Sequence, residues 1–263
     1  MKKKCLKSLN IGKMKKIKSL KEKFFKNGFV KVENLFNKNE VKKLLKEVEK
    51  VKKNFLIIKN PNMHFTKDQK FNTIHNINEY IKKGFILKIT KDKRLKDIVD
   101  SILESKTKLR NLEFFLKPAK TGKAAPVHQD NYYWNIPSKK ALNVWIACTQ
   151  SNSKNGGLYY FKSSHKEGLI NHELSLQPGT SQQISSDYFK RKKFKKIYPD
   201  LKPGDCILHH CEVMHGSKEN KSKLNRVGIV MSYKSIKAKI DKKGWFNYQQ
   251  KLKKNNILIS KIN

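Results

Sequence analysis

The stretch LNVWIACTQSNSKNGGLYYF, residues 142–161, contains two short runs rich in aliphatic, aromatic and β-branched residues, Leu142–Thr149 and Leu158–Phe161. Runs of this length and composition are typical of β-strands. The segment Asn155-Gly156-Gly157 between them is typical of a turn, because glycine and asparagine tolerate the backbone angles that a reversal needs. The stretch therefore predicts two strands separated by a turn.

The same pattern continues on both sides of this stretch. Pro118–Gly122 and Lys202-Pro203-Gly204 are further turn signals. The remaining strand candidates are Leu109–Lys117, Pro126–Asn131, Asp205–His210 and Arg226–Tyr233. Regularly spaced short strands favour a β-sandwich or barrel over a parallel α/β sheet. Residues Ile170–Pro199 have no clear period, and we expect a long lid-like excursion over one mouth of the barrel.

The chain before residue 106 has a helical pattern. Apolar residues at helical spacing occur in Lys15–Asn27, after the capping box Asn37–Glu40, and in Asp92–Glu104. A short strand candidate, Phe29–Glu33, lies between the first two helices. Each helix is amphipathic and lysine-faced, so each needs an apolar surface to pack on.

A chain of 263 residues has the length of one large domain, and no linker or internal repeat divides it. We expect a basic N-terminal tail over residues 1–20 and a single domain over residues 21–263. The parts of this domain are a helical flank over about 21–105, a β core over about 106–236 and a C-terminal extension over 237–263.

The charge of the chain is extreme, with 60 Lys and Arg against 21 Asp and Glu, a formal +39. Such a charge is typical of nucleic-acid-binding proteins, but those usually use the planar fork of arginine as well as lysine. Lysines run through every segment, so we interpret most of the charge as solvated surface and expect no specific nucleic-acid partner. The four arginines are Arg94, Arg110, Arg191 and Arg226.

Other protein classes are disfavoured by the same sequence. No apolar stretch approaches the roughly 18–20 residues that a membrane span needs. Met1–Leu20 has no continuous apolar segment of the kind a secretory signal carries. The cysteines include no C-x-x-C pair, which argues against a disulfide scaffold or zinc site and favours a reduced, cytoplasmic protein with buried thiols. They are Cys5, Cys148, Cys206 and Cys211.

His128-Gln129-Asp130 is the first candidate for chemistry. Within a strand, side chains alternate, so His128 and Asp130 would emerge on the same face. His215 ends another strand-like run and could supply a third ligand if the barrel brings these strands together. Two histidines and one carboxylate leave open positions on a metal, which is the arrangement of non-haem Fe(II) oxygenases. A structural zinc site would use four protein ligands, usually with thiolates.

Arg226 lies on the next strand candidate after His215. Its guanidinium could hold a remote carboxylate with two parallel hydrogen bonds. A 2-oxo acid that chelates the metal through its 1-carboxylate and 2-oxo group would present its far carboxylate at about that distance. The position of Arg226 therefore predicts a site for 2-oxoglutarate.

Seven segments between about Leu20 and Lys234 carry a family resemblance in the same order. They are FKNGFVKVEN (25–34), FFLKP (114–118), HQDNYYW (128–134), NVWIA (143–147), NGGLYYFKSSHKEG (155–168), KPGD (202–205) and HGSKENKSKLNR (215–226). Together they resemble the phytanoyl-CoA dioxygenase family of Fe(II)/2-oxoglutarate-dependent oxygenases.

This resemblance implies a mainly β fold with flanking helices around a double-stranded β-helix, the jelly-roll or cupin-like core. It also implies that His128, Asp130 and His215 are the iron ligands. Arg226 would form the salt bridge with 2-oxoglutarate, and Trp145 and Ser217 would line the cosubstrate pocket. Asn220 matches a position that supports the loop before Arg226.

The implied activity is that of a dioxygenase that uses Fe(II), O2 and 2-oxoglutarate, hydroxylates a small molecule and yields succinate and CO2, with ascorbate as a supporting reductant. Relatives that halogenate carry a small residue in place of the carboxylate, so Asp130 favours hydroxylation. Nothing in the sequence selects the substrate; an anionic substrate tail is one interpretation of the basic cluster Arg191–Lys196 and solvated surface is the other.

Two alternatives stay open at this point. One is a non-catalytic basic module that binds nucleic acid or another polyanion on a degenerate jelly-roll, as the +39 charge would suit. The other is a cupin-like isomerase or another metal enzyme that does not use 2-oxoglutarate.

The remaining histidines have ordinary structural interpretations. Because adjacent strand residues face opposite ways, at most one of His209 and His210 points inward, and we interpret both as structural. We interpret His165 as a turn-packing residue. Surface or core roles are expected for His64, His75 and His172.

The residues after the HQD triplet are ambiguous. Tyr132–Trp134 could line a substrate pocket or fill the barrel. Lys117 could contact an anion, but a single lysine carries little weight in so lysine-rich a chain.

Overall fold

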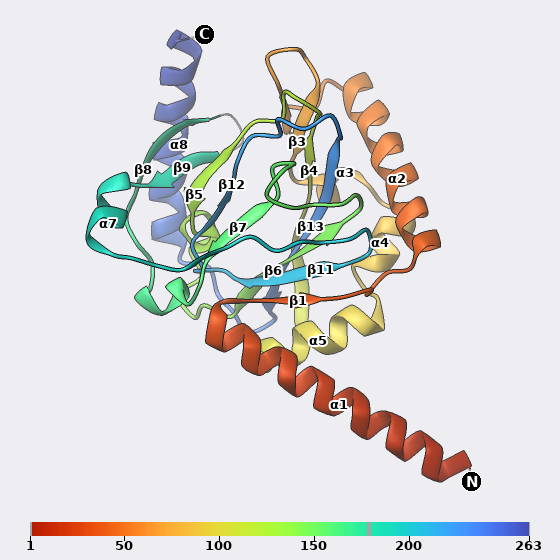
Figure 1. The fold of residues 1–263 in the computed structure, drawn as a ribbon. Coiled ribbons are helices and arrows are strands. Elements are labelled where there is room, and N and C mark those ends of the chain that lie inside the picture. The colour runs from red at the N-terminus through yellow and green to blue at the C-terminus, as the bar shows by residue number, and fades with distance from the viewer. Residues whose placement is uncertain (1, 178–179, 263) are drawn as a thin grey trace.

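The computed structural model describes the backbone of residues 2–177 and 180–262 and the side chains of residues 12–175, 177 and 180–253. Its larger sheet is antiparallel and has seven strands (Figure 1). Their bounds are β1 Phe29–Val32, β2 Met63–Phe65, β3 Phe71–Ile74, β4 Thr107–Lys117, β6 Ala141–Ala147, β11 Cys206–His210 and β13 Arg226–Ser235. Their order across the sheet is β1-β11-β6-β13-β4-β3-β2.

A second, smaller antiparallel sheet closes the core. Its strands are β5 Ala125–His128, β7 Leu158–Phe161, β10 Lys196–Ile197 and β12 His215–Ser217, in the order β10-β7-β12-β5. A separate hairpin of β8 (His172–Gln177) and β9 (Thr180–Ile184) packs beside β5. The two sheets form the jelly-roll core that the family resemblance implies.

Helices cover the outer face of the larger sheet. α1 (Lys2–Asn27), α2 (Lys38–Ile57), α4 (Phe85–Ile89) and α5 (Lys93–Leu103) all supply residues to one apolar cluster against it (Figure 1). The capping box is confirmed, because the Asn37 side chain accepts from the Glu40 backbone N–H and the Glu40 side chain accepts from that of Asn37. α3 (Ile77–Tyr80) is a single turn, and α8 (Lys242–Ile262) lies on the other side of the molecule, behind β8 and β9.

Strand β6 shows how the strand residues divide between the two sides of the sheet. Val144 and Ile146 pack into the cluster under the helices. Trp145 and Ala147 pack into a second cluster with residues of β1, β7, β11 and β13, in the interior between the sheets. All seven residues of β6 are buried, so the strand is apolar on both faces with one exception, Asn143, which points to the interior.

Some element boundaries differ from the predictions. α1 begins at Lys2 rather than Lys15, and the excursion at residues 170–199 contains β8, β9, β10 and α7 (Ser186–Arg191). The strand predicted over Pro126–Asn131 ends at His128, because Asp130 begins the short helix α6 (Asp130–Trp134).

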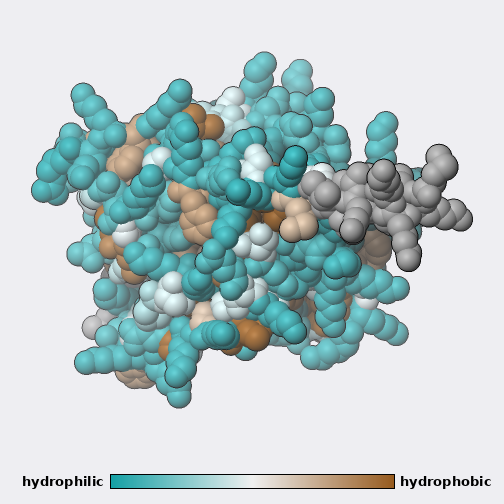
Figure 2. Space-filling view, turned by 90° about the horizontal axis from the view of Figure 1, so that it is seen from below, coloured by the Kyte–Doolittle hydropathy of each residue, from teal (hydrophilic) through white to brown (hydrophobic). Residues whose placement is uncertain are grey.

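No helix in the described part of the chain is long and apolar enough to cross a membrane. Hydrophilic side chains cover most of the face seen in Figure 2, and the apolar ones on it are scattered. Most of the described lysines are exposed, so lysine is used mainly at solvated positions.

Candidate metal and cosubstrate site

His128, Asp130 and His215 come together between β5 and β12. His128 ends β5, His215 begins β12, and the two residues are directly paired in the antiparallel register. Asp130 follows from the first position of α6 rather than from strand alternation. One ligand atom from each of the three lies within 4.8 Å of the others, so they can hold one metal ion.

Both histidines present the same ring nitrogen to this site. Nδ1 of His128 lies 2.8 Å from the Pro126 carbonyl oxygen, and Nδ1 of His215 lies 3.0 Å from that of Val213. A carbonyl only accepts, so Nδ1 carries the proton and Nε2 keeps its lone pair. Burial lowers the pKa of each ring to about 4, which leaves both imidazoles neutral at neutral pH.

One carboxylate oxygen of Asp130 faces the two histidines, and hydrogen bonds from other residues hold the second oxygen in place. Its Oδ1 lies 3.7 Å from His128 Nε2 and 3.9 Å from His215 Nε2. Its Oδ2 accepts hydrogen bonds from Asn143 Nδ2 at 2.8 Å and His209 Nε2 at 3.0 Å. Burial acts to raise the pKa of this carboxyl, but the surrounding histidines hold it below its usual range. The carboxylate is ionised and oriented for a cation.

His209 thus has a role that the sequence did not reveal. Its Nδ1 accepts from the Tyr160 hydroxyl at 3.0 Å, so Nε2 carries the proton that it donates to Asp130. His210 faces away, toward Phe24 and His165. Strand alternation predicts that at most one of His209 and His210 points inward. The inward residue is His209, and it positions the Asp130 carboxylate.

Arg226 begins β13 and lies opposite Lys117, the last residue of β4. Its side chain is 1% exposed, its Nε has no partner, and no described carboxylate is within ion-pair distance. Burial lowers its pKa from 12.5 to about 9, and its guanidinium lies 5.2 Å from the centre of the Trp145 ring. A buried cation without a counter-charge requires an anionic ligand.

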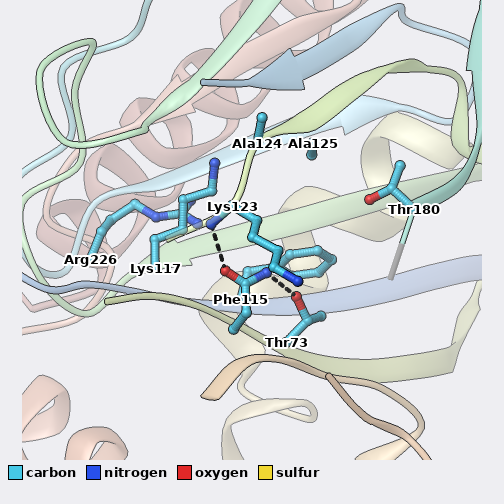
Figure 3. Close-up of a pocket in the computed structure, with 9 residues that line it drawn as sticks. Thr73, Phe115, Lys117, Lys123, Ala124, Ala125, Thr180 and Arg226 are labelled. Carbon is cyan, nitrogen blue, oxygen red and sulfur yellow. Dashed lines mark hydrogen bonds between the residues drawn. The ribbon is translucent and has the colours of Figure 1, made fainter. Parts of the chain in front are cut away.

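Lys117, which the sequence analysis set aside, lies beside Arg226 in a small pocket that also includes Phe115, Ala125 and Thr180 (Figure 3). Its Nζ donates to Ser217 Oγ at 2.6 Å and to the Lys218 carbonyl. Burial and then the charge of Arg226 hold its pKa well below the usual range. Two buried basic side chains side by side fit one carboxylate. The sequence signal for Lys117 is its place at the end of an apolar strand candidate.

Trp145 and Asn220 both lie close to the Lys117 and Arg226 pair. Trp145 is buried beneath Arg226. The Asn220 side chain donates to the carbonyls of Lys117 and Leu224, so it ties the loop before Arg226 to the end of β4.

Replacing Gly228 by Ala should damage this pocket. A Cβ at residue 228 would overlap ring atoms of Trp145, which has no room to move in the buried interior. We expect a loss of about 1–3 kcal/mol in the free energy of unfolding and weaker 2-oxoglutarate binding. Gly12→Ala is the control, since a Cβ there meets nothing within 4 Å. Urea unfolding and 2-oxoglutarate titration would measure both effects; equal behaviour of the two variants would contradict the prediction.

The residues after the HQD triplet divide between the two open interpretations. The Tyr133 ring lies 5.7 Å from the His128 ring, beside the metal ligands, whereas the Tyr132 ring stacks on His172 at 4.1 Å. Trp134 is buried in a small apolar cluster with Ile136. Tyr133 therefore lines the site, and Trp134 mainly fills the core.

Buried histidines outside the site should make stability depend on pH. Burial lowers the pKa of His64 to about 4 and of His210 to about 3. Between these values and 6.5 the unfolded chain binds protons that the folded chain does not, so stability rises with pH in this window. We expect a loss of roughly 1–2 kcal/mol per histidine on going from pH 7.5 to 5, measured by urea unfolding. His210→Gln should reduce the slope of the free energy of unfolding against pH. An unchanged slope in this variant would contradict the prediction.

This site on a jelly-roll defines the class of the protein, a non-haem Fe(II)- and 2-oxoglutarate-dependent dioxygenase. The Phytanoyl-CoA dioxygenase (PhyH) family matches residues 24–228, and the chain belongs to this family. The polyanion-binding alternative is not favoured.

Individual relatives agree with this assignment. Ectoine dioxygenase of Bordetella bronchiseptica is 25% identical over 235 residues, which cover 80% of this chain and 73% of the relative. Phytanoyl-CoA dioxygenase domain-containing protein 1 homolog of Caenorhabditis elegans is 26% identical over 252 residues, covering 79% and 87%. Among solved structures, EctD from S. alaskensis with bound Fe has a similar fold, with a TM-score of 0.71 at 20% identity over 84% of this chain and 78% of that one.

Proposed function

We propose that this protein hydroxylates a C–H bond of a small organic molecule, with 2-oxoglutarate and O2 as cosubstrates and with succinate and CO2 as co-products. The observation that carries the proposal is the pairing of two sites in one barrel. One is a cluster of two neutral histidines and one anchored carboxylate. The other is a pair of buried basic side chains, Arg226 and Lys117, with no ion-pair partner among the described residues.

In this proposal His128, Asp130 and His215 hold Fe(II). The donor set fits this ion, because each histidine offers a lone pair on Nε2 and Asp130 offers a free oxygen. When bound, the metal supplies the activation of O2 that no protein side chain can supply. Ascorbate would support the reaction by keeping iron reduced.

Arg226 and Lys117 bind the far carboxylate of 2-oxoglutarate, and Ser217 and Trp145 shape its pocket. The guanidinium offers two parallel donors, and Lys117 Nζ is held beside it by the Ser217 hydroxyl. The pocket is largely closed from water by the apolar interior around Trp145, which strengthens each of these interactions.

Substrate would approach from the side of Tyr133. Hydroxylation is favoured over halogenation because Asp130 occupies the position that halide would need. The exposed cluster Arg191–Lys196 at the end of α7 is where an anionic substrate tail could be attracted in solution. The described cysteines are buried free thiols, which supports a reducing, cytoplasmic compartment within this proposal.

The test is 2-oxoglutarate binding by purified protein with Fe(II), and slow succinate release in the presence of ascorbate. Lys117→Met should weaken binding about 10- to 100-fold, because one charge-assisted hydrogen-bonding partner is lost. Lys120→Met is the matched control, since Lys120 is exposed on the following turn. If 2-oxoglutarate does not bind the wild-type protein, or if both variants bind it equally, the proposal fails.

A further inference from the structure

Arg110 is the arginine whose role the proposed function leaves unexplained. Arg94 makes ion pairs with Glu40 at 2.6 Å and Asp92 at 2.8 Å, and Arg191 is exposed at the end of α7. Arg110 has neither arrangement: its Nε is buried without a partner, and no described carboxylate lies within 4 Å of its guanidinium. In a chain that uses lysine at most basic positions, this arginine needs a specific explanation.

A β-bulge turns Arg110 into the barrel. Along β4 and β13, Asn111 pairs with Ser232 and Leu109 pairs with Tyr233, so Arg110 is an extra residue with no partner on β13. Leu109 packs on the helix side of the sheet, while Asn111 donates to Glu113 on the interior side. The bulge adds Arg110 to the interior side, where its guanidinium lies 4.9 Å from the centre of the Trp134 ring.

This places Arg110 at the opposite end of the barrel from the cosubstrate cations. Lys117 and Arg226 are paired at one end of β4 and β13. At the other end, Ser232 donates to Asn143, and Asn143 donates to Asp130. The candidate iron ligand Asp130 therefore lies at the Arg110 end of these strands, and its charge acts on Arg110.

The charges around Arg110 leave it available for a ligand. Burial lowers its pKa, while Glu113 and Asp130 act from a distance in the opposite direction. Glu113 is already engaged, by His75 Nδ1 at 2.6 Å and by Asn111 at 2.9 Å. Asp130 is engaged by Asn143 and His209 as described above. No described residue accepts a hydrogen bond from the guanidinium of Arg110.

We propose that Arg110 binds a carboxylate of the substrate, so that the substrates of this enzyme are organic carboxylic acids. One cation fits a singly charged carboxylate better than a phosphate dianion, because Glu113 and Asp130 already add negative charge nearby. The neighbouring phenols of Tyr133 and Tyr248 are hydrogen-bonded, to Gln182 O at 3.0 Å and Ser181 Oγ at 3.3 Å, so their rings present apolar walls. The rest of the substrate is accordingly apolar. The inference rests on the proposed function, since it assigns the substrate of that same site.

The test compares acids with their uncharged counterparts. Protein loaded with Fe(II) and 2-oxoglutarate under anaerobic conditions is titrated with phenylacetate, 3-phenylpropionate and the straight-chain C4–C10 carboxylates, and with the matching primary amides. We expect one or more acids to bind at least about 10-fold more tightly than the amide, as a charge-assisted hydrogen-bond pair predicts. Arg110→Met should remove this preference, and Arg110→Lys should keep part of it. Lys108→Met, an exposed position on the same strand, should keep all of it.

Three results would overturn the inference: no acid in the series binds, acids and amides bind alike, or Arg110→Met changes only the melting temperature while the preference for acids persists. The last would mean that Arg110 only packs on Trp134. Failure of the proposed function is seen separately, as an absence of 2-oxoglutarate binding and succinate release by the wild-type protein before any acid is added.

Discussion

Replacing His215 by Ala should lower succinate release by more than about 100-fold while leaving the protein folded. Loss of a residue that merely orients a metal ligand typically costs 10- to 100-fold in metal affinity or activity, and loss of a ligand itself should cost more. With His215 removed, only His128 Nε2 and Asp130 Oδ1 remain to hold the metal. The measurements are Fe(II) affinity by anaerobic titration, and succinate release at saturating Fe(II).

The control for this substitution is His165→Ala. His165 lies in the 3-10 turn Ser164–Glu167, and its Nε2 contacts the Phe25 carbonyl. Its ring packs against His210, which faces away from Asp130. It should keep full Fe(II) affinity, and circular dichroism should show both variants folded. Unchanged Fe(II) affinity in His215→Ala would exclude this residue as a ligand and with it the assigned metal site.

Much of the fold could be predicted from sequence because the strands are short, apolar and separated by strong turn signals. Leu158–Phe161 has the predicted bounds, and the capping box at Asn37 is present. The pairing of these strands could not be predicted from composition, since the order β1-β11-β6-β13-β4-β3-β2 joins segments far apart in the chain. The family resemblance implied the jelly-roll topology, which the spacing of the strand candidates alone did not predict.

The same limit applies to the site. The argument from strand alternation placed His128 and Asp130 on one face, but Asp130 reaches the site from the start of α6. Alternation could say that His209 and His210 diverge, yet not which of them faces Asp130. The place of Lys117 at the end of an apolar strand candidate is a weak signal in so lysine-rich a chain, and what sets this lysine apart is burial next to Arg226.

The bulge at Arg110 is a property of strand pairing as well. In the sequence, Arg110 is one more basic residue near the start of a strand. Only the register shift opposite Ser232 and Tyr233 shows that its side chain joins the interior side with Asn111. A specificity residue of this kind becomes visible only when both strands are placed.

Replacing Arg226 by Met should weaken 2-oxoglutarate binding but increase the stability of the cosubstrate-free protein. Its guanidinium is buried with an unpartnered Nε and no counter-charge, so the cosubstrate-free protein bears an unfavourable charge in this pocket. We expect Arg226→Met to weaken 2-oxoglutarate binding by about 100- to 1,000-fold, as removal of one partner of a buried charge pair predicts. The cosubstrate-free protein should instead gain about 1–3 kcal/mol in the free energy of unfolding, because an apolar side chain replaces an unpaired ion.

Arg191→Met is the matched control for this opposite pair of effects, because it removes the same charge from an exposed position at the end of α7. It should change neither quantity, as surface charges contribute little. The measurements are titration calorimetry with 2-oxoglutarate and urea unfolding without it. If Arg226→Met binds 2-oxoglutarate normally, the carboxylate is held elsewhere. If Arg226→Met binds 2-oxoglutarate weakly and is also less stable than the wild type, Arg226 has a structural role in the barrel and is not a preformed anion-binding group. Only a preformed anion site predicts that Arg226→Met gains stability and loses 2-oxoglutarate binding. In such a site the cosubstrate neutralises the unpaired charge that destabilises the empty pocket.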